Sequence, residues 1–170
     1  LARVSWFPEG TRVLVQRQSR DQKRLDVLSY AVTGGEAREL FSERSDTWVD
    51  LHDDLYFLPE RREILWASQR SGHNHLYLYD YNGMLKGAVT AGDWDVIGEW
   101  NAPAVRGIDE RRGRVYFMST LKTPLERQLY VTDLDVALSP SLGFIRFCSA
   151  FMAGPEHGFP HYTLLLHEES

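Results

Sequence analysis

The sequence predicts an all-β fold made of short antiparallel strands, and three observations lead to this prediction. Short apolar segments recur along the chain at a step of 51 residues. These segments are rich in β-branched and aromatic residues and are bounded by Gly, Asn, Asp and Ser, which is typical of strands. A helical period of 3.6 residues does not extend over any useful length. Four short strands in roughly 40 to 50 residues are the signature of a β-propeller blade.

The first repeated element is a charged residue followed by three apolar residues. It occurs at Arg12–Val15, Glu63–Trp66 and Arg114–Phe117, and successive copies start 51 residues apart. Each copy follows a turn-like stretch. An apolar residue leads into each of these turns at the same step: Trp6, Phe57 and Ile108. The element therefore predicts a strand, a turn and a second strand in every unit.

The second repeated element supplies the third strand of each unit. Leu25–Tyr30 is matched 51 residues later by Leu76–Tyr81, and then 53 residues later by Leu129–Leu134. The two extra residues fit into a proline-containing loop at 120–127. Tyr81-Asn82-Gly83 then predicts a tight turn into a fourth strand.

A tryptophan-bearing loop closes the first two units, at Trp48 and Trp94. The repeats thus predict a partial β-propeller, with three four-stranded antiparallel blades over residues 1–137. Residues 138–170 form a divergent tail that is expected to supply part of an incomplete fourth blade. Two segments of this tail are expected to form strands: 145–148 and 164–166. At 51 residues a unit, 170 residues give about 3.3 units, too few to close a ring of four to eight blades.

Charge and composition exclude several classes of protein. The chain of 170 residues has a net charge of −5, which gives no sign of the basic surface of a nucleic-acid-binding protein. No stretch of 18 or more apolar residues is present, so no membrane span is expected. The single cysteine, Cys148, excludes an internal disulfide framework and a cysteine-based zinc site. The sequence predicts no cofactor and no bound metal.

Five short motifs occur in an order that resembles a known family. They are Trp48-Val49, Ile64–Gly72, His75–Tyr79, Thr90–Gly98 and Gln128-Leu129-Tyr130. Their succession is similar to the N-terminal β-propeller of the dipeptidyl peptidase IV family of serine peptidases, over about residues 1–137. The resemblance implies an eight-bladed propeller that gates an α/β-hydrolase domain, which removes Xaa-Pro or Xaa-Ala dipeptides from peptide N-termini.

The resemblance also implies that this chain is an internal part of that propeller, without catalytic residues of its own. The nucleophile elbow of the family, Gly-x-Ser-x-Gly, is absent from the sequence. The Glu-Glu motif that captures the free amino group of the substrate lies upstream of the matched region in the family. The implied partners are a peptide substrate and the α/β-hydrolase domain of the parent protein, and a bacterial parent would be periplasmic or extracellular.

The most function-like stretch is Trp48–Asp54, in which three carboxylates and one histidine cluster. In some members of the resembled family, the residues shortly after the Trp-Val pair give an aromatic ring and an arginine to the outer substrate pocket. The resemblance therefore implies a substrate-pocket rim at Asp50, Leu51, His52 and Asp53, although Leu51 and His52 differ from those family side chains. The alternative is a solvated loop between two blades.

Other candidate residues favour a structural interpretation. His73 and His75 have the spacing of a metal pair on one face of a strand, but no third ligand lies near them in the sequence. Cys148 is expected to be a small core residue rather than a nucleophile. All the tryptophans are expected to pack between blades: Trp6, Trp48, Trp66, Trp94 and Trp100.

Functions from different classes compete at this point. The first is a non-catalytic gating segment of a dipeptidyl peptidase IV-like enzyme. The second is a stand-alone protein-binding module that completes its fold by self-association, because an open arc of blades exposes edges and faces that invite pairing. A third, a hydrolase that is active by itself, would require turnover of an Xaa-Pro substrate by the isolated chain.

Overall fold

The structure, a computed structural model, describes residues 3–98, 102–135, 146–153 and 163–168. These residues form thirteen strands and no helix, which confirms the all-β prediction. The strands are β1 (Arg3–Trp6), β2 (Arg12–Gln18), β3 (Arg24–Ala31), β4 (Arg38–Arg44), β5 (Leu55–Leu58), β6 (Glu63–Ser68), β7 (His75–Asp80), β8 (Leu85–Ala88), β9 (Val105–Asp109), β10 (Arg114–Ser119), β11 (Gln128–Asp133), β12 (Arg146–Ala153) and β13 (Thr163–Glu168).

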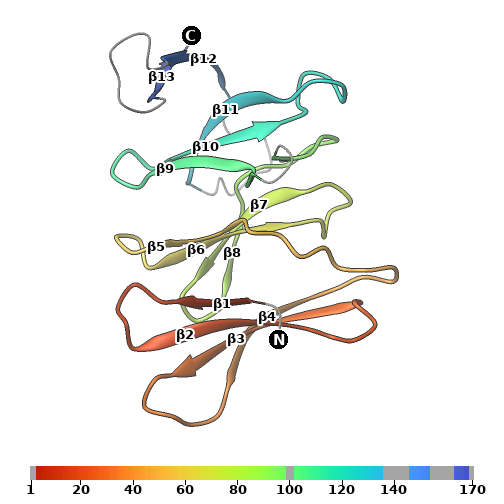
Figure 1. Cartoon of the computed structure of the whole chain (residues 1–170), viewed down its shortest axis with the longest axis vertical. Coiled ribbons are helices and arrows are strands. Elements are labelled where there is room, and N and C mark those ends of the chain that lie inside the picture. Colours follow the sequence, from red (N-terminus) through yellow and green to blue (C-terminus); the bar gives the residue numbers. More distant parts are fainter. Residues whose placement is uncertain (1–2, 99–101, 136–145, 154–162, 169–170) are drawn as a thin grey trace.

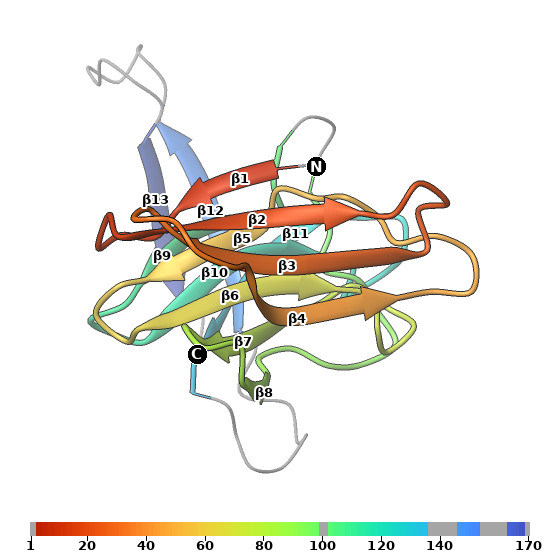
Figure 2. The same ribbon diagram turned by 90° about the horizontal axis from the view of Figure 1, so that it is seen from below.

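The strands form three antiparallel sheets that lie one on another (Figure 1). The first sheet has the order β1-β2-β3-β4, the second β5-β6-β7-β8, and the third β13-β12-β11-β10-β9. Figure 2 views this stack from the end formed by the first sheet. Sheets built from consecutive strands and stacked face to face match the predicted arc of propeller blades. Among the described residues, no helix has the length and apolarity needed to cross a membrane.

The 51-residue step sets the second strand of each sheet, because β2, β6 and β10 begin 51 residues apart. The equivalent residues of the third strands in the first two sheets are not 51 residues apart. Val13 pairs with Tyr30, whereas Ile64 pairs with Tyr79, 49 residues after Tyr30. The hairpin of the first sheet is one residue pair longer, which shifts its return strand by two residues. A shift by an even number keeps every side chain on the same face of the sheet.

The second sheet is buried on both faces. Along β6, Ile64 and Trp66 point toward the first sheet, and Leu65 and Ala67 point toward the third. All four residues are fully buried. Because other sheets cover both sides, residues 64–67 of β6 form a continuous apolar run rather than an alternation of apolar and polar residues. The hydrophobic core therefore consists of two layers, one on each side of the second sheet.

The predicted turn at residues 81–83 connects β7 to β8 and touches the first sheet. The Asp80 carboxylate accepts hydrogen bonds from the backbone N–H groups of Asn82 and Met84, both at 2.8 Å. Gly83 has a φ of 87°, and a Cβ atom there would lie 2.2 Å from the carbonyl oxygen of Leu40 in β4. Only glycine fits this position, so the turn can lie directly on the backbone of the first sheet.

The tail extends the third sheet. β12 pairs with β11, with Tyr130 opposite Phe147, and β13 pairs with β12, with Cys148 opposite Glu168. The two tail segments that were expected to be strands fall largely within β12 and β13. The third sheet thus takes its fourth and fifth strands from beyond residue 137, and the division of the chain at that residue stays a prediction.

Candidate functional site

The linker between β4 and β5, residues 45–54, carries the predicted rim. Its backbone is fastened to the hairpin between β2 and β3, because the Val49 N–H group donates to the Gln22 carbonyl oxygen at 2.7 Å. The Gln18 side chain donates from Nε2 to the Val49 carbonyl oxygen at 2.7 Å. Val49 is itself buried in the layer between the first two sheets. These contacts hold the linker across the end of the two sheets.

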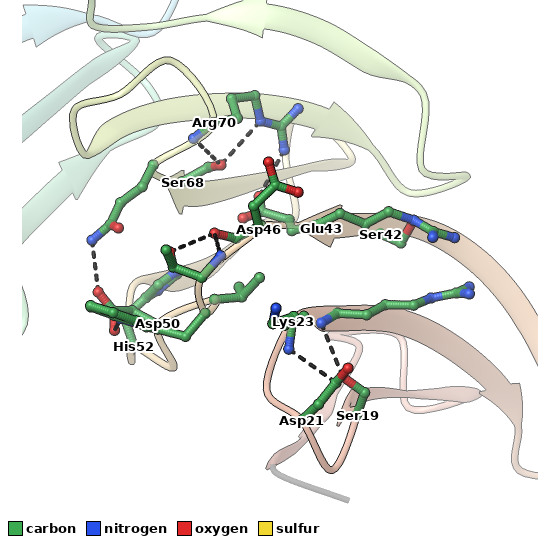
Figure 3. A pocket seen from close by; sticks show the side chains of 17 residues that line it. Ser19, Asp21, Lys23, Ser42, Glu43, Asp46, Asp50, His52, Ser68 and Arg70 are labelled. Carbon is green, nitrogen blue, oxygen red and sulfur yellow. Dashed lines mark hydrogen bonds and ion pairs between the residues drawn. The ribbon is translucent and has the colours of Figure 1, made fainter.

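A pocket of about 960 Å³ lies beside this linker, between the first and second sheets. Figure 3 shows its lining, with Lys23 and Asp21 from the β2–β3 hairpin on one side and Arg70 and Ser68 on the other. Acidic and basic side chains both line the pocket, together with the exposed ring of Trp48. The lining therefore offers both hydrogen-bond donors and acceptors, although Glu43 and Arg70 pair with each other.

Asp50 is held at this pocket by two neutral hydrogen-bond donors. Trp48 donates from Nε1 to Asp50 Oδ1 at 2.8 Å, and Gln69 donates from Nε2 to Asp50 Oδ2 at 2.9 Å. Neither donor carries a charge, so the negative charge of Asp50 is not cancelled by them. The Asp50 carboxylate is therefore a fixed, exposed and anionic group.

All four predicted rim residues line a second pocket, of about 530 Å³, between the second and third sheets. Leu51 is exposed, and Asp53 is exposed and forms an ion pair with Arg3 of β1. Asp50 and His52 line both pockets, so the linker lies between the two openings. The structure thus brings Asp50, Leu51, His52 and Asp53 together around one opening.

His52 lies deeper than its neighbours in the linker. Its ring packs against Trp66 with centroids 4.7 Å apart, and its Nδ1 atom is buried without a hydrogen-bond partner. Burial lowers the pKa of His52 below its ordinary value, although the negative charges of Asp54 and Glu43 oppose the shift. His52 is therefore neutral at neutral pH and forms part of the pocket wall.

Asp54, the third carboxylate of the stretch, has a structural role that the sequence does not reveal. It is 6% exposed and accepts hydrogen bonds from the backbone N–H groups of Ala104 and Val105, both at 3.1 Å. The Tyr56 hydroxyl also donates to Asp54, at 3.0 Å. Burial and the nearby Asp54 charge raise the pKa of Tyr56 well above its ordinary value. Asp54 thus joins the second sheet to the start of β9.

Glu43 of β4 and Arg70 form part of the wall of the 960 Å³ pocket. Glu43 Oε1 accepts hydrogen bonds from Trp66 Nε1 at 2.7 Å and from Arg70 Nη2 at 2.8 Å. The Arg70 guanidinium lies over the Tyr77 ring, 4.6 Å from its centroid. Sequence reasoning missed this group because its members come from different repeats. The position of Arg70 within the Ile64–Gly72 motif was the only signal that pointed to it.

The candidate metal pair is not assembled. His75 is buried, and its ring nitrogens lie 3.1 Å from Thr90 Oγ1 and 3.0 Å from the Gly92 carbonyl oxygen. Burial lowers the pKa of His75. His73 Nδ1 lies 3.3 Å from the Asp95 carboxylate. Within the described part of the chain, no group of three or more His, Cys, Asp or Glu side chains could hold a metal ion.

The tryptophans divide into two groups. Trp66 and Trp94 are buried between sheets, which confirms the packing prediction for them. Trp48 is exposed, so the prediction is wrong for it, whereas the exposed Trp6 lies on a face that no described sheet covers, and its packing between blades stays a prediction. Trp48 lies at the 960 Å³ pocket, and Trp6 lies on the outer face of the first sheet. Trp100 and the side chain of Cys148 lie outside the described residues.

Comparisons with known proteins agree with this architecture. The family model described as the dipeptidyl peptidase IV (DPP IV) N-terminal region matches residues 1–143. Dipeptidyl peptidase 8 of Homo sapiens is 26% identical over an alignment of 181 positions. The match covers 78% of this chain and 20% of the relative. Dipeptidyl peptidase 4 of Trichophyton equinum is 26% identical over 141 residues, which cover 79% of this chain and 17% of the relative.

A solved structure shows the same fold. The crystal structure of dipeptidyl peptidase 4 from Porphyromonas gingivalis matches with a TM-score of 0.68 and 20% sequence identity. The match covers 87% of this chain and 20% of that chain. This chain therefore spans about a fifth of the length of the proteins it matches.

Proposed function

Because the chain belongs to the dipeptidyl peptidase IV family, as the match over residues 1–143 shows, we propose that it is a non-catalytic propeller segment of a dipeptidyl peptidase IV-like serine peptidase. In the parent protein it gates and positions peptides for a hydrolase domain that removes Xaa-Pro or Xaa-Ala dipeptides from N-termini. The rim of Asp50, Leu51, His52 and Asp53 contacts the peptide.

The placement of the rim residues around one open pocket is the observation that supports this proposal most directly. Leu51 offers an exposed apolar side chain, and Asp50 offers a carboxylate whose two donors are neutral. The charge of Asp53 is balanced by Arg3. Asp50 is therefore the group that accepts hydrogen bonds from a backbone N–H or an ammonium group of the peptide.

Titration of the chain with an Ala-Pro peptide, followed by amide NMR shifts and tryptophan fluorescence, tests the proposal. Saturable shifts are expected at residues 48–53, with the exposed Trp48 ring beside Asp50 as the fluorescent reporter. Asp50→Asn is expected to weaken binding about tenfold or more, because it removes a charge-assisted hydrogen bond. Binding that is unchanged in Asp50→Asn would overturn the rim assignment.

The matched control for Asp50→Asn is Asp133→Asn, which removes an exposed carboxylate that lines neither pocket. This control should bind the peptide like the unaltered chain. The unaltered chain should not turn over a fluorogenic Xaa-Pro substrate, because its sequence has no Gly-x-Ser-x-Gly elbow. Turnover that a serine-directed inhibitor abolishes would contradict the non-catalytic role.

A second candidate function is a protein-binding module that completes its fold by self-association. It is favoured by the outer face of the first sheet, where Val4 and Trp6 are 53% and 60% exposed. Large apolar side chains that are exposed on one face of a sheet are a feature of interaction sites. The two candidate functions involve different residues, so each can be tested without the other.

A further inference from the structure

The linkers that follow the first and second sheets are each held by a buried valine. In the first linker, the Val49 N–H group donates to the Gln22 carbonyl oxygen, and the Val49 carbonyl oxygen accepts from Gln18 Nε2, both at 2.7 Å. In the second linker, which joins β8 to β9, the Val96 N–H group donates to the Asn74 carbonyl oxygen at 2.8 Å. The Val96 carbonyl oxygen accepts from Asn74 Nδ2 at 2.6 Å. The two valines are therefore equivalent residues of the repeat.

The second linker continues as a short strand along the end of β10. The Ile97 N–H group donates to the Met118 carbonyl oxygen at 3.1 Å. The Thr120 N–H group donates to the Asp95 carbonyl oxygen at 3.0 Å. Together these bonds enclose an isolated antiparallel β-bridge. The end of β10 is thus covered by backbone from the linker.

The end of β6 has no such strand beside it. Gln69 lies 51 residues before Thr120 and is its equivalent, and Trp48, directly before Val49, is the equivalent of Asp95. Within the described part of the chain, the Gln69 N–H group has no acceptor and the Trp48 carbonyl oxygen has no donor. The two backbones are joined through side chains instead, because Gln69 Nε2 donates to Asp50 Oδ2 at 2.9 Å.

The way the first linker is anchored accounts for this gap. Asn74, which holds Val96, directly precedes β7, whereas Gln22, which holds Val49, lies at the tip of the longer hairpin between β2 and β3. The first linker also has less chain in which to return, since Val49 lies 6 residues before the start of β5 and Val96 lies 9 residues before the start of β9. The first linker therefore stays away from the end of β6.

The 960 Å³ pocket lies at this gap. Trp48 and Asp50 line it from the linker, and Ser68 and Gln69 line it from the end of β6. Figure 3 shows Asp50 and Ser68 at the pocket, together with Arg70, whose guanidinium is paired with Glu43. Neighbouring strands lie about 4.8 Å apart, so one missing strand leaves the width of a single extended chain.

We infer that this gap binds an extended peptide by strand addition. A peptide carbonyl oxygen accepts a hydrogen bond from the Gln69 N–H group, and the N–H group of the next peptide residue donates to the Trp48 carbonyl oxygen. One strand can make both bonds, because the C=O and N–H groups of a peptide unit point to opposite sides. The second linker shows the same position filled by backbone. The inference rests on the proposed function and specifies how the peptide is bound.

Amide hydrogen exchange of the chain saturated with the peptide Ala-Pro-Val-Thr-Val tests the inference. The Gln69 amide should exchange about tenfold or more slowly in the complex, because it gains an acceptor. The Thr120 amide is the matched control within the same protein, since its acceptor, Asp95, belongs to the chain itself. Exchange of the Gln69 amide that is unchanged in the saturated protein would overturn the inference.

Gln69→Ala separates the backbone of this residue from its side chain. The variant loses the hydrogen bond to Asp50 but keeps the N–H group, so the amide at this position should still exchange more slowly when peptide is bound. Slowing that occurs in the unaltered chain but not in saturated Gln69→Ala would mean that the side chain binds the peptide, and would contradict strand addition.

Peptides in which an ester replaces one amide test the bond to Trp48. The ester that removes the N–H group facing the Trp48 carbonyl oxygen should weaken binding about five- to tenfold. Esters at adjacent positions should have less effect, because successive N–H groups of a strand face opposite sides. Equal affinity for all the esters would be evidence against main-chain pairing.

The measurements also distinguish the binding mode from the proposed function. Peptide binding that Asp50→Asn weakens, without a change at the Gln69 amide, would leave the rim function standing and overturn strand addition. A peptide that does not bind saturably would overturn both.

Discussion

The first and second sheets are both four-stranded and are built from the same repeat, yet their second strands differ sharply in burial. β6 of the second sheet is buried along its whole length, whereas β2 of the first sheet has only two buried positions. The second sheet has a sheet on each side, and the first has a described neighbour on one side only. Position in the stack therefore explains the difference between β2 and β6, whereas in β3 of the first sheet residues 25–29 are buried although that sheet is covered on one side only.

The two sheets also differ in their polar contacts. The second sheet is joined to the first through the hydrogen bond between Trp66 and Glu43, and to the third through Asp54 and the start of β9. On the first sheet, Asp26 is satisfied by Arg17 and Arg24 of its own strands. Buried polar groups thus link the second sheet to both of its neighbours, while the buried Asp26 of the first sheet pairs only with residues of its own sheet.

The largest expected difference in stability is between truncation of a tryptophan in the second sheet and truncation of one in the first. Trp66→Ala removes a fully buried ring and its hydrogen bond to Glu43, so we expect the free energy of unfolding to fall by about 3–5 kcal/mol. Trp6→Ala removes an exposed ring and should change it by less than about 1 kcal/mol in dilute protein. Urea unfolding followed by circular dichroism measures both. Equal losses would contradict the assignment of the core to the second sheet.

A smaller difference in the free energy of unfolding is expected between removal of the Asp54 carboxylate and removal of the neighbouring Asp53 carboxylate. Asp54→Ala leaves two buried backbone N–H groups without their acceptor and removes the 3.0 Å hydrogen bond of the Tyr56 hydroxyl, so we expect the free energy of unfolding to fall by about 2–3 kcal/mol. Asp53→Ala breaks only the exposed ion pair with Arg3 and should cost less than about 1 kcal/mol. The same urea titrations compare the two variants. A loss in Asp54→Ala as small as in Asp53→Ala would show that this carboxylate does not hold the second and third sheets together.

Much of the fold could be predicted from the sequence because its repeat is regular where strands pack. The 51-residue step places β2, β6 and β10 correctly. The 49-residue step from Tyr30 to Tyr79 could not be predicted, because it depends on the number of residue pairs in a hairpin. Both alignments put the apolar residues on the same face, so the hydrophobic pattern does not distinguish them.

The candidate site was harder to predict because burial depends on contacts across sheets. Asp53 and Asp54 are adjacent residues of one type, yet Asp53 is exposed while Asp54 is buried. The partners that distinguish Asp54 are backbone N–H groups at Ala104 and Val105, 50 and 51 residues away in the chain. The depth of His52 likewise depends on the Trp66 ring, which belongs to another strand. Such long-range partners leave no local pattern.

Amide hydrogen exchange in β2 and β6 tests the central claim most directly, because these equivalent strands are each paired on both sides. In dilute protein the amides of β6 should exchange much more slowly than those of β2, since only β6 lies in a sheet that is covered on both faces. Equal protection of β2 and β6 in dilute protein would contradict the claim that stacking decides their burial and stability.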